Sequence, residues 1–152
     1  MMRHILCFGN PLHGDDGFGP AVYQRLAQLP LAADVRLFDA GTAGLAALAL
    51  FRDCAEAVVV DALAPAGHPG RLLELAAEAI PLESAAAGHG HGVGYLLAAL
   101  AVMPEPAPAL RIVAVEAAAV EPFRPGLSAP VAAAVDRAVA LLSVYFAPQH
   151  HE

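Results

Sequence analysis

Short, continuously apolar segments, separated by longer segments of helical character, are the feature that most constrains how this chain can fold. Residues 55–62, AEAVVVDA, are the clearest of them, because three β-branched residues in succession are typical of a strand. Residues 4–9, 35–40 and 109–117 have the same bounded apolar character, and residues 70–75 indicate a further strand. Continuous apolar character is typical of parallel strands that are covered on both faces. The pattern therefore predicts a largely parallel sheet between two other layers.

The segments between the predicted strands have helical spacing. Residues 18–29 place Val22, Leu26 and Leu29 on one face of a helix. Three further helices are expected: residues 44–51 with Thr42 as the N-cap, residues 92–103, and residues 128–146 with Ser128 as the N-cap. We therefore expect an α/β fold, a three-layer sandwich with a mainly parallel, twisted sheet of about five strands flanked by helices. One domain should span residues 1–152, with a core that includes Ile5, Leu6, Val58, Val59, Val60, Ile112 and Val113.

The charge balance and the cysteines exclude several classes of function. Eight basic and fifteen acidic residues give a formal charge of −7, and no cluster of Lys and Arg is present to bind nucleic acid or an anionic membrane. No apolar stretch reaches the roughly 20 residues of a membrane span, and the amino terminus lacks the pattern of a signal peptide. Cys7 and Cys54 have no CxxC spacing, so they are expected to be buried free thiols. We expect a monomeric cytoplasmic protein.

Residues 9–19, GNPLHGDDGFG, place two adjacent aspartates between glycines directly after the first strand. Asp and Gly are ordinary turn formers. A glycine-rich loop here could also cradle a phosphate, but this one lacks the spacing and the lysine of a P-loop, and its carboxylates would repel the anion. We expect the turn to point one of the two carboxylates into a cleft while the other holds the loop, and backbone bonds across the glycine turn would suffice to account for Asp15 alone.

Other polar residues stand at or after the later strands. Asp39 closes the second strand, Asp61 closes the third, and His89 and His91 stand in the glycine-rich segment before the third helix. Because the carboxyl ends of parallel strands meet at one edge of a sheet, these groups can converge there with Asp15 and Asp16. Two carboxylates and an imidazole suit a borderline divalent metal such as nickel or zinc. So few protein ligands leave coordination positions open for a substrate.

Each of these residues also has a simpler interpretation. An aspartate at the end of a strand is about as often a cap or a turn acceptor as a functional group. His89 and His91 could bind metal adventitiously. His4 and His68 have no partner in the sequence and are expected at the surface.

Four segments occur in the order found in nickel–iron (NiFe) hydrogenase maturation endopeptidases: GNPLHGDDGFGPAV, DAGTAG, VVVDA and HGVGYLLAAL. The chain resembles this family over nearly its whole length. The resemblance implies an endopeptidase that removes the C-terminal extension of the hydrogenase large-subunit precursor after nickel insertion. It also implies that Asp16, Asp61 and His91 bind nickel supplied by the precursor, with cadmium or zinc as surrogates. His91 is preferred to His89 because HGVGYLL matches the family's pattern of a histidine followed by a helix, and Asp16 stands where some members have Glu.

Three ligands of this kind cannot saturate nickel, so cysteines of the precursor could complete its shell and make the metal a recognition element. The metal could also polarise the scissile carbonyl or lower the pKa of an attacking water. Asp16 and Asp39 are then the candidate catalytic residues, with Asp39 orienting the substrate or the water. Two other functions stay open: a non-catalytic metal-dependent binding protein or chaperone for the precursor, and a small-molecule hydrolase on the same scaffold.

Overall fold

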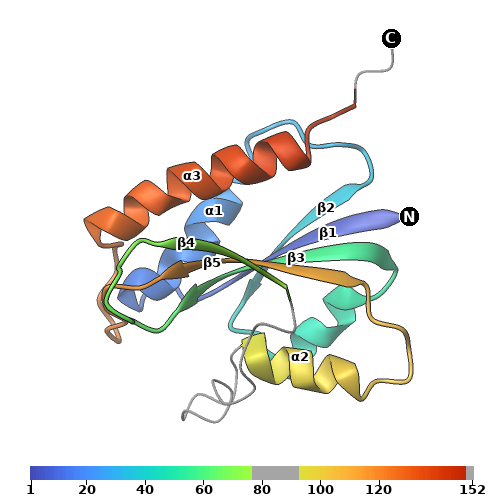
Figure 1. Cartoon of the computed structure of the whole chain (residues 1–152), viewed down its shortest axis with the longest axis horizontal. Helices are drawn as coiled ribbons and strands as arrows, with labels where there is room; N and C mark the ends of the chain where they lie inside the picture. The colour runs from blue at the N-terminus through green and yellow to red at the C-terminus, as the bar shows by residue number, and fades with distance from the viewer. Residues whose placement is uncertain (77–92, 150–152) are drawn as a thin grey trace.

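The computed structural model describes residues 1–76 and 93–149, and a five-stranded sheet forms their centre (Figure 1). The strands are β1 (Met2–Phe8), β2 (Val35–Gly41), β3 (Cys54–Leu63), β4 (Leu72–Ala76) and β5 (Ala109–Glu116). Their order across the sheet is β2-β1-β3-β5-β4, with β4 antiparallel to β5 at one edge and every other neighbouring pair parallel. The predicted mainly parallel sheet is confirmed, including the strand expected at residues 70–75.

Helices cover both faces of this sheet. The helices α1 (Phe18–Leu26) and α3 (Ala129–Tyr145) lie on one face, and α2 (Val93–Ala101) lies on the other with the 3₁₀ helix η2 (Gly44–Phe51), as Figure 1 shows. A second 3₁₀ helix, η1 (Gly14–Gly17), connects β1 to α1. In the described part of the chain, we find no helix long and apolar enough to span a membrane. The three-layer α/β sandwich expected from the sequence is thus confirmed.

The alternation of side chains along each strand divides the core into two clusters. On β3, Val58 and Val60 pack with residues of α1 and α3, whereas Val59 packs with residues of α2 and η2. Every predicted core residue is buried: Ile5, Leu6, Val58, Val59, Val60, Ile112 and Val113. Because side chains two apart share a face of the sheet, Asp61 belongs with Val59 to the α2 face.

The caps of two helices differ in detail from the sequence-based expectation. Residues 44–51 form a 3₁₀ helix whose N-cap is Ala43, not Thr42. Thr42 lies instead in a turn between Gly41 and Gly44, whose φ angles of 54° and 59° are both left-handed. Ser128 is the N-cap of α3 as predicted, but its side chain makes no bond to the amides of that helix. Its hydroxyl donates instead to the carboxylate of Asp15.

Two glycines let the chain turn back tightly after β1. A Cβ atom on Gly9, whose φ is 138°, would lie 2.0 Å from the carbonyl oxygen of Asp16. A Cβ atom on Gly19 would lie 2.0 Å from the carbonyl oxygen of Phe8. Such distances are far inside van der Waals contact, so only glycine allows this approach. The two glycines thereby hold η1 against the carboxyl end of β1.

Candidate active site at the carboxyl ends of the strands

The carboxyl ends of β1 and β3 lie at the switch point of the sheet. From β1 the chain crosses to β2 on one side, and β3 then pairs with β1 on the other side. In open α/β sheets, ligands bind in the crevice at such a point. The 3₁₀ helix η1 follows β1 and contacts β3, so Asp15 and Asp16 both lie at this switch point.

The carboxylate of Asp15 is buried, with 2% of the residue exposed. Its Oδ2 accepts hydrogen bonds from the amides of Ala118 at 2.8 Å and Ala119 at 3.2 Å and from the hydroxyl of Ser128 at 2.9 Å. Its Oδ1 accepts a bond from the amide of Ser128 at 2.7 Å. Burial opposes ionisation, but the bonds from Ser128 and the two alanine amides outweigh it and lower the pKa of Asp15. Asp15 is thus a structural residue as predicted, but its carboxylate binds the segment between β5 and α3 and not the backbone of the glycine turn.

The side chain of Asp16 takes a different direction from that of Asp15. Consecutive residues of a 3₁₀ helix, with three residues per turn, are about 120° apart around its axis. Asp16 is half-buried, and its Oδ2 accepts a hydrogen bond from the amide of Asn10 at 2.9 Å. Asn10 in turn accepts a bond at Oδ1 from the amide of Leu12 at 2.9 Å. The loop after β1 is therefore closed around the Asp16 carboxylate.

Asp61 lies inside β3, level with Ala114 of β5, because the strand continues to Leu63 instead of ending at the aspartate. The pKa of Asp61 is raised to about 8, first by burial and further by the negative charge of Asp16, against a hydrogen bond from the amide of Ala62. That amide donates to Asp61 Oδ1 at 2.8 Å. A buried carboxylate beside a second negative charge favours a proton or a cation next to it. The structure thus places Asp61 close enough to Asp16 to be affected by its charge, and a joint role of the two carboxylates remains a prediction.

Asp39 lies one strand further along the sheet and is exposed. It pairs in register with Cys7 of β1, and its Oδ1 accepts a bond from the amide of Gly41 at 3.2 Å. Asp39 alternates with Phe38 and Ala40, which pack on the α2 face, so it belongs to the opposite face from Asp61. Asp39 is therefore at the same end of the sheet as the two coupled carboxylates but is not part of their pair.

Cys7 lies between these carboxylates in the sheet but has no means to act as a nucleophile. Its side chain is a buried free thiol, and burial raises its pKa, with smaller contributions from the charges of Asp39 and Asp61. A cysteine reacts as the thiolate, which this environment suppresses. Both cysteines are free and buried, as predicted.

The two histidines of the predicted site, His89 and His91, lie outside the described residues. The helix that follows them, α2, begins at Val93 and covers the face of the sheet to which Asp61 belongs. Within residues 1–76 and 93–149, no group of three or more His, Cys, Asp and Glu side chains is arranged to hold a metal ion. All three ligands of the expected set, Asp16 and Asp61 included, therefore remain predictions.

The sequence analysis did not predict that the loop between β5 and α3 contacts the segment after β1. Residues 118, 119 and 128 of this segment bind Asp15, and Gly14 donates its amide to the carbonyl of Arg124 at 2.8 Å. No local pattern indicates these contacts.

His4 was also assigned wrongly to the surface. It is buried, with Nδ1 2.8 Å from the carbonyl of Leu50 and its ring edge-on to Phe38.

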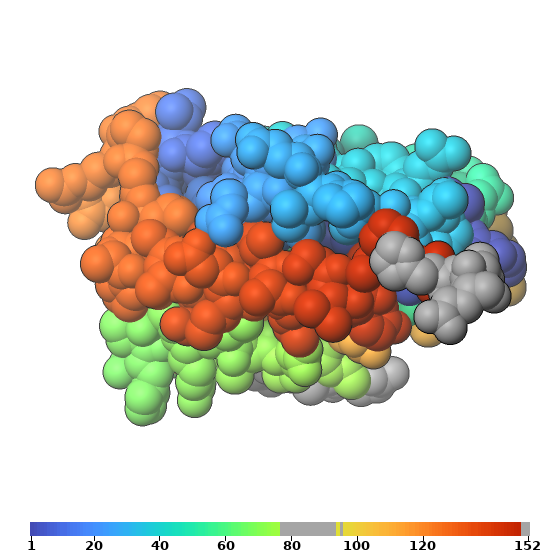
Figure 2. All heavy atoms as spheres, turned by 90° about the horizontal axis from the view of Figure 1, so that it is seen from above, coloured from blue at the N-terminus to red at the C-terminus, as the bar shows by residue number. Residues whose placement is uncertain are grey.

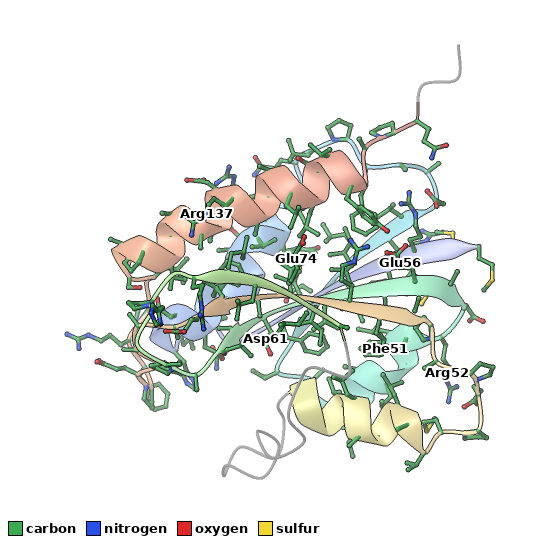
Figure 3. The ribbon with its side chains drawn as sticks, viewed as in Figure 1. Phe51, Arg52, Glu56, Asp61, Glu74 and Arg137 are labelled. Atoms are coloured by element: carbon green, nitrogen blue, oxygen red, sulfur yellow. The ribbon has the colours of Figure 1, made fainter. Side chains whose placement is uncertain are left out.

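A cavity of about 650 Å³ lies at the opposite end of the sheet, where the strands begin. Phe51 and Arg52 line it with Cys54 and Met103, and Figure 3 shows Phe51 and Arg52 well away from Asp61. Among the described site residues, none of Asp16, Asp39 and Asp61 lines this cavity. Although this cavity is large, its position at the other end of the sheet separates it from the carboxylate pair.

The model of the hydrogenase maturation protease family matches residues 20–143 of the chain. The solved structure of the hydrogenase maturating endopeptidase HybD from E. coli superposes with a TM-score of 0.82 at 27% identity, covering 95% of this chain and 91% of that one. The hydrogenase 2 maturation peptidase from a Thaumarchaeota archaeon superposes with a TM-score of 0.69 at 27% identity, covering 97% and 99%.

The curated relatives match over a shorter stretch. The hydrogenase expression/formation protein HupD of Rhodobacter capsulatus is 36% identical over 78 residues, which are 51% of this chain and 37% of that protein. A relative from Methanocaldococcus jannaschii is 34% identical over 79 residues, 51% of each chain. The matched part of the chain thus spans about half or less of the length of these relatives. The family match and the shared fold together establish that the chain belongs to the hydrogenase maturation protease family.

Proposed function

We propose that this chain is an endopeptidase that removes the C-terminal extension from the large-subunit precursor of a NiFe hydrogenase after nickel has been inserted. The observation that carries the proposal is the coupled pair of carboxylates, Asp16 and Asp61, at the switch point of the sheet. In a chain of the hydrogenase maturation protease family, this pair is where nickel of a loaded precursor would be received. The nickel in this proposal belongs to the substrate.

The chemistry of the two carboxylates fits a divalent cation. The raised pKa of Asp61 reflects burial of a carboxylate beside a second negative charge, and a bound cation would reverse that penalty. In the described part of the chain, the hydrogen bonds to these groups use Oδ2 of Asp16 and Oδ1 of Asp61. We propose the remaining oxygens as metal ligands. His91 is proposed as the third ligand, with His89 as its competitor, and cadmium or zinc as surrogate metals.

The residues of the chain would then bind and orient the substrate around that metal. Asp16 and Asp61 hold the nickel-loaded end of the precursor, while Asp15 keeps η1 in place beneath it. Asp39, exposed at the same end of the sheet, is proposed to orient the peptide or a water. Nickel bound there would polarise the scissile carbonyl and acidify a water. Open coordination positions, to be filled by the precursor, would make the metal the means of recognition.

The test is to incubate the purified chain with nickel-loaded and with nickel-free precursor and to measure the intact mass of the precursor. Loss of the extension from the loaded form alone supports the proposal. Asp16→Asn should abolish this loss. Asp53→Asn, the same change at an exposed carboxylate where β3 begins, is the control that should retain it. Binding of the precursor without any change in mass would indicate a chaperone instead.

A further inference from the structure

The loop between β5 and α3 exposes a large apolar side chain in an unfavourable backbone conformation. Phe123 is 83% exposed, and its φ angle is 58°. The left-handed region is disfavoured for residues with a bulky side chain. Because the phenyl ring is exposed in the free protein, no burial of apolar surface offsets this cost. Strained residues of this kind persist where the surrounding structure fixes them, and they concentrate at functional sites.

The segment that carries Asp16 is also the segment that fixes Phe123. Arg124 accepts a hydrogen bond from the amide of Gly14 at 2.8 Å and pairs with His13 in an isolated parallel bridge. The ring of His13 packs edge-on to the ring of Phe123, with their centroids 5.8 Å apart. The Asp15 carboxylate binds both ends of the same loop. Phe123 is therefore held in a defined position relative to the candidate active site.

Two further exposed apolar residues belong to these two segments. Leu12 in the loop after β1 is 52% exposed, and Val120 in the loop after β5 is 46% exposed. We name Leu12, Val120 and Phe123 the rim patch. Figure 2 shows the orange β5–α3 loop projecting at one end of the molecule, beside the blue segment that follows β1. The charges of this loop are neutralised by an ion pair between Arg124 and Glu121, so the patch suits an apolar partner surface.

We propose that the rim patch is the docking surface for the folded body of the large-subunit precursor, with Phe123 as the anchor that enters an apolar recess of the precursor. This inference rests on the proposed function. A polypeptide that delivers its end to Asp16 and Asp61 must cover the adjacent segments, whereas a second copy of this chain seated there would block the site. A patch of three side chains also fits a transient encounter better than a permanent interface, which buries far more surface.

The experiment compares the wild-type chain with three variants, using nickel-loaded precursor as the probe. Phe123→Asn removes the ring, and Asn tolerates the left-handed conformation, so folding should be preserved. Phe123→Tyr keeps an aromatic anchor. Val102→Asn makes the equivalent change at a side chain that is 82% exposed, in the turn after α2, away from the rim patch. The dissociation constant is measured from binding of the precursor to the surface-immobilised chain. Cleavage assays give kcat and KM, and thermal unfolding checks that each variant is folded.

We expect Phe123→Asn to raise the dissociation constant and KM by about tenfold or more, with a smaller effect on kcat and no loss of thermal stability; a tenfold change is typical of a lost interface anchor. Phe123→Tyr should stay within about threefold of wild type, and Val102→Asn should match wild type. Unchanged binding by Phe123→Asn, or an equal loss in Val102→Asn, would overturn the docking surface. If the wild type binds but does not cleave, the endopeptidase proposal fails while the binding constants still judge the docking surface. Absence of wild-type binding overturns both.

Discussion

Removing the Asp15 carboxylate should destabilise the fold far more than a typical surface substitution. Asp15→Ala leaves the amides of Ala118, Ala119 and Ser128 and the hydroxyl of Ser128 without their acceptor. A hydrogen bond to a charged group contributes about 1.5–3 kcal/mol to stability, so four would give about 6–12 kcal/mol if they were additive. They are not additive here, because Ala118 and Ala119 are exposed and water can reach their amides.

We therefore expect Asp15→Ala to lower the free energy of unfolding by about 2–4 kcal/mol, which corresponds to a fall in Tm of about 5–15 °C for a domain of this size. Ser128→Ala, which removes the hydroxyl but keeps the amide bond, should cost only about 1 kcal/mol. Urea unfolding followed by circular dichroism at pH 7 measures both. A loss below about 1 kcal/mol for Asp15→Ala would refute the anchoring role.

The pH dependence gives a second measure of the same anchor. Because the pKa of Asp15 is lowered in the folded state, its stabilising contribution is present above the pKa of an unfolded Asp, about 3.9. That contribution is lost as the pH falls through the lower folded value. The difference in stability between wild type and Asp15→Ala should therefore shrink under acid, and a difference independent of pH would contradict the role of the charge.

Four further predictions concern the carboxylates, the histidines and the metal. Asp16→Asn should abolish cleavage of the loaded precursor, and Asp15→Asn should reduce it less; the reverse ranking in a mass-shift assay would show that the wrong carboxylate was chosen. His91→Ala should abolish nickel-dependent cleavage while His89→Ala retains most activity, and equal losses would mean that the two histidines act as a unit. Because the pKa of Asp61 is raised to about 8, its contribution to stability falls as the pH rises from about 4 towards that value and then levels off. Asp61→Asn should thus be more stable than wild type at pH 8, by about 1–3 kcal/mol after allowance for partial exposure. Urea unfolding at pH 5 and pH 8 measures this difference, and a variant less stable than wild type at pH 8 would contradict the prediction. The free enzyme should bind nickel weakly and leave nickel-free precursor uncut; calorimetry that finds tight binding, or a mass assay that finds cleavage, would refute this checkpoint.

The sequence by itself determined the layers of the fold. The run Val58–Val60 offers no polar side chain to solvent, so its strand must be covered on both faces. The structure places this strand in the centre of the sheet. The spacing of Val22, Leu26 and Leu29 likewise indicated one apolar helical face. Val22 and Leu26 are fully buried, whereas Leu29 lies beyond the end of α1 and is exposed. Such patterns are readable because burial repeats with the period of the local backbone. The segment at 44–51 has the predicted bounds, but it is a 3₁₀ helix, and its N-cap is Ala43 because Thr42 lies in a turn between two left-handed glycines.

Only the tertiary structure explains how two adjacent aspartates take different roles, a distinction that the local sequence pattern left open and that the family resemblance alone assigned. Asp15 and Asp16 are alike in sequence. The distinction comes from Ser128, 113 residues away, which donates a hydrogen bond to the carboxylate of Asp15. The carboxylate of Asp16 instead acts on Asp61 of β3 through its charge. The raised pKa of Asp61 depends in the same way on burial and on the charge of Asp16. The exposure of Phe123 follows from the pairing of its loop with residues 13 and 14. These properties arise from contacts between distant segments, and no local periodicity records which distant segments will meet.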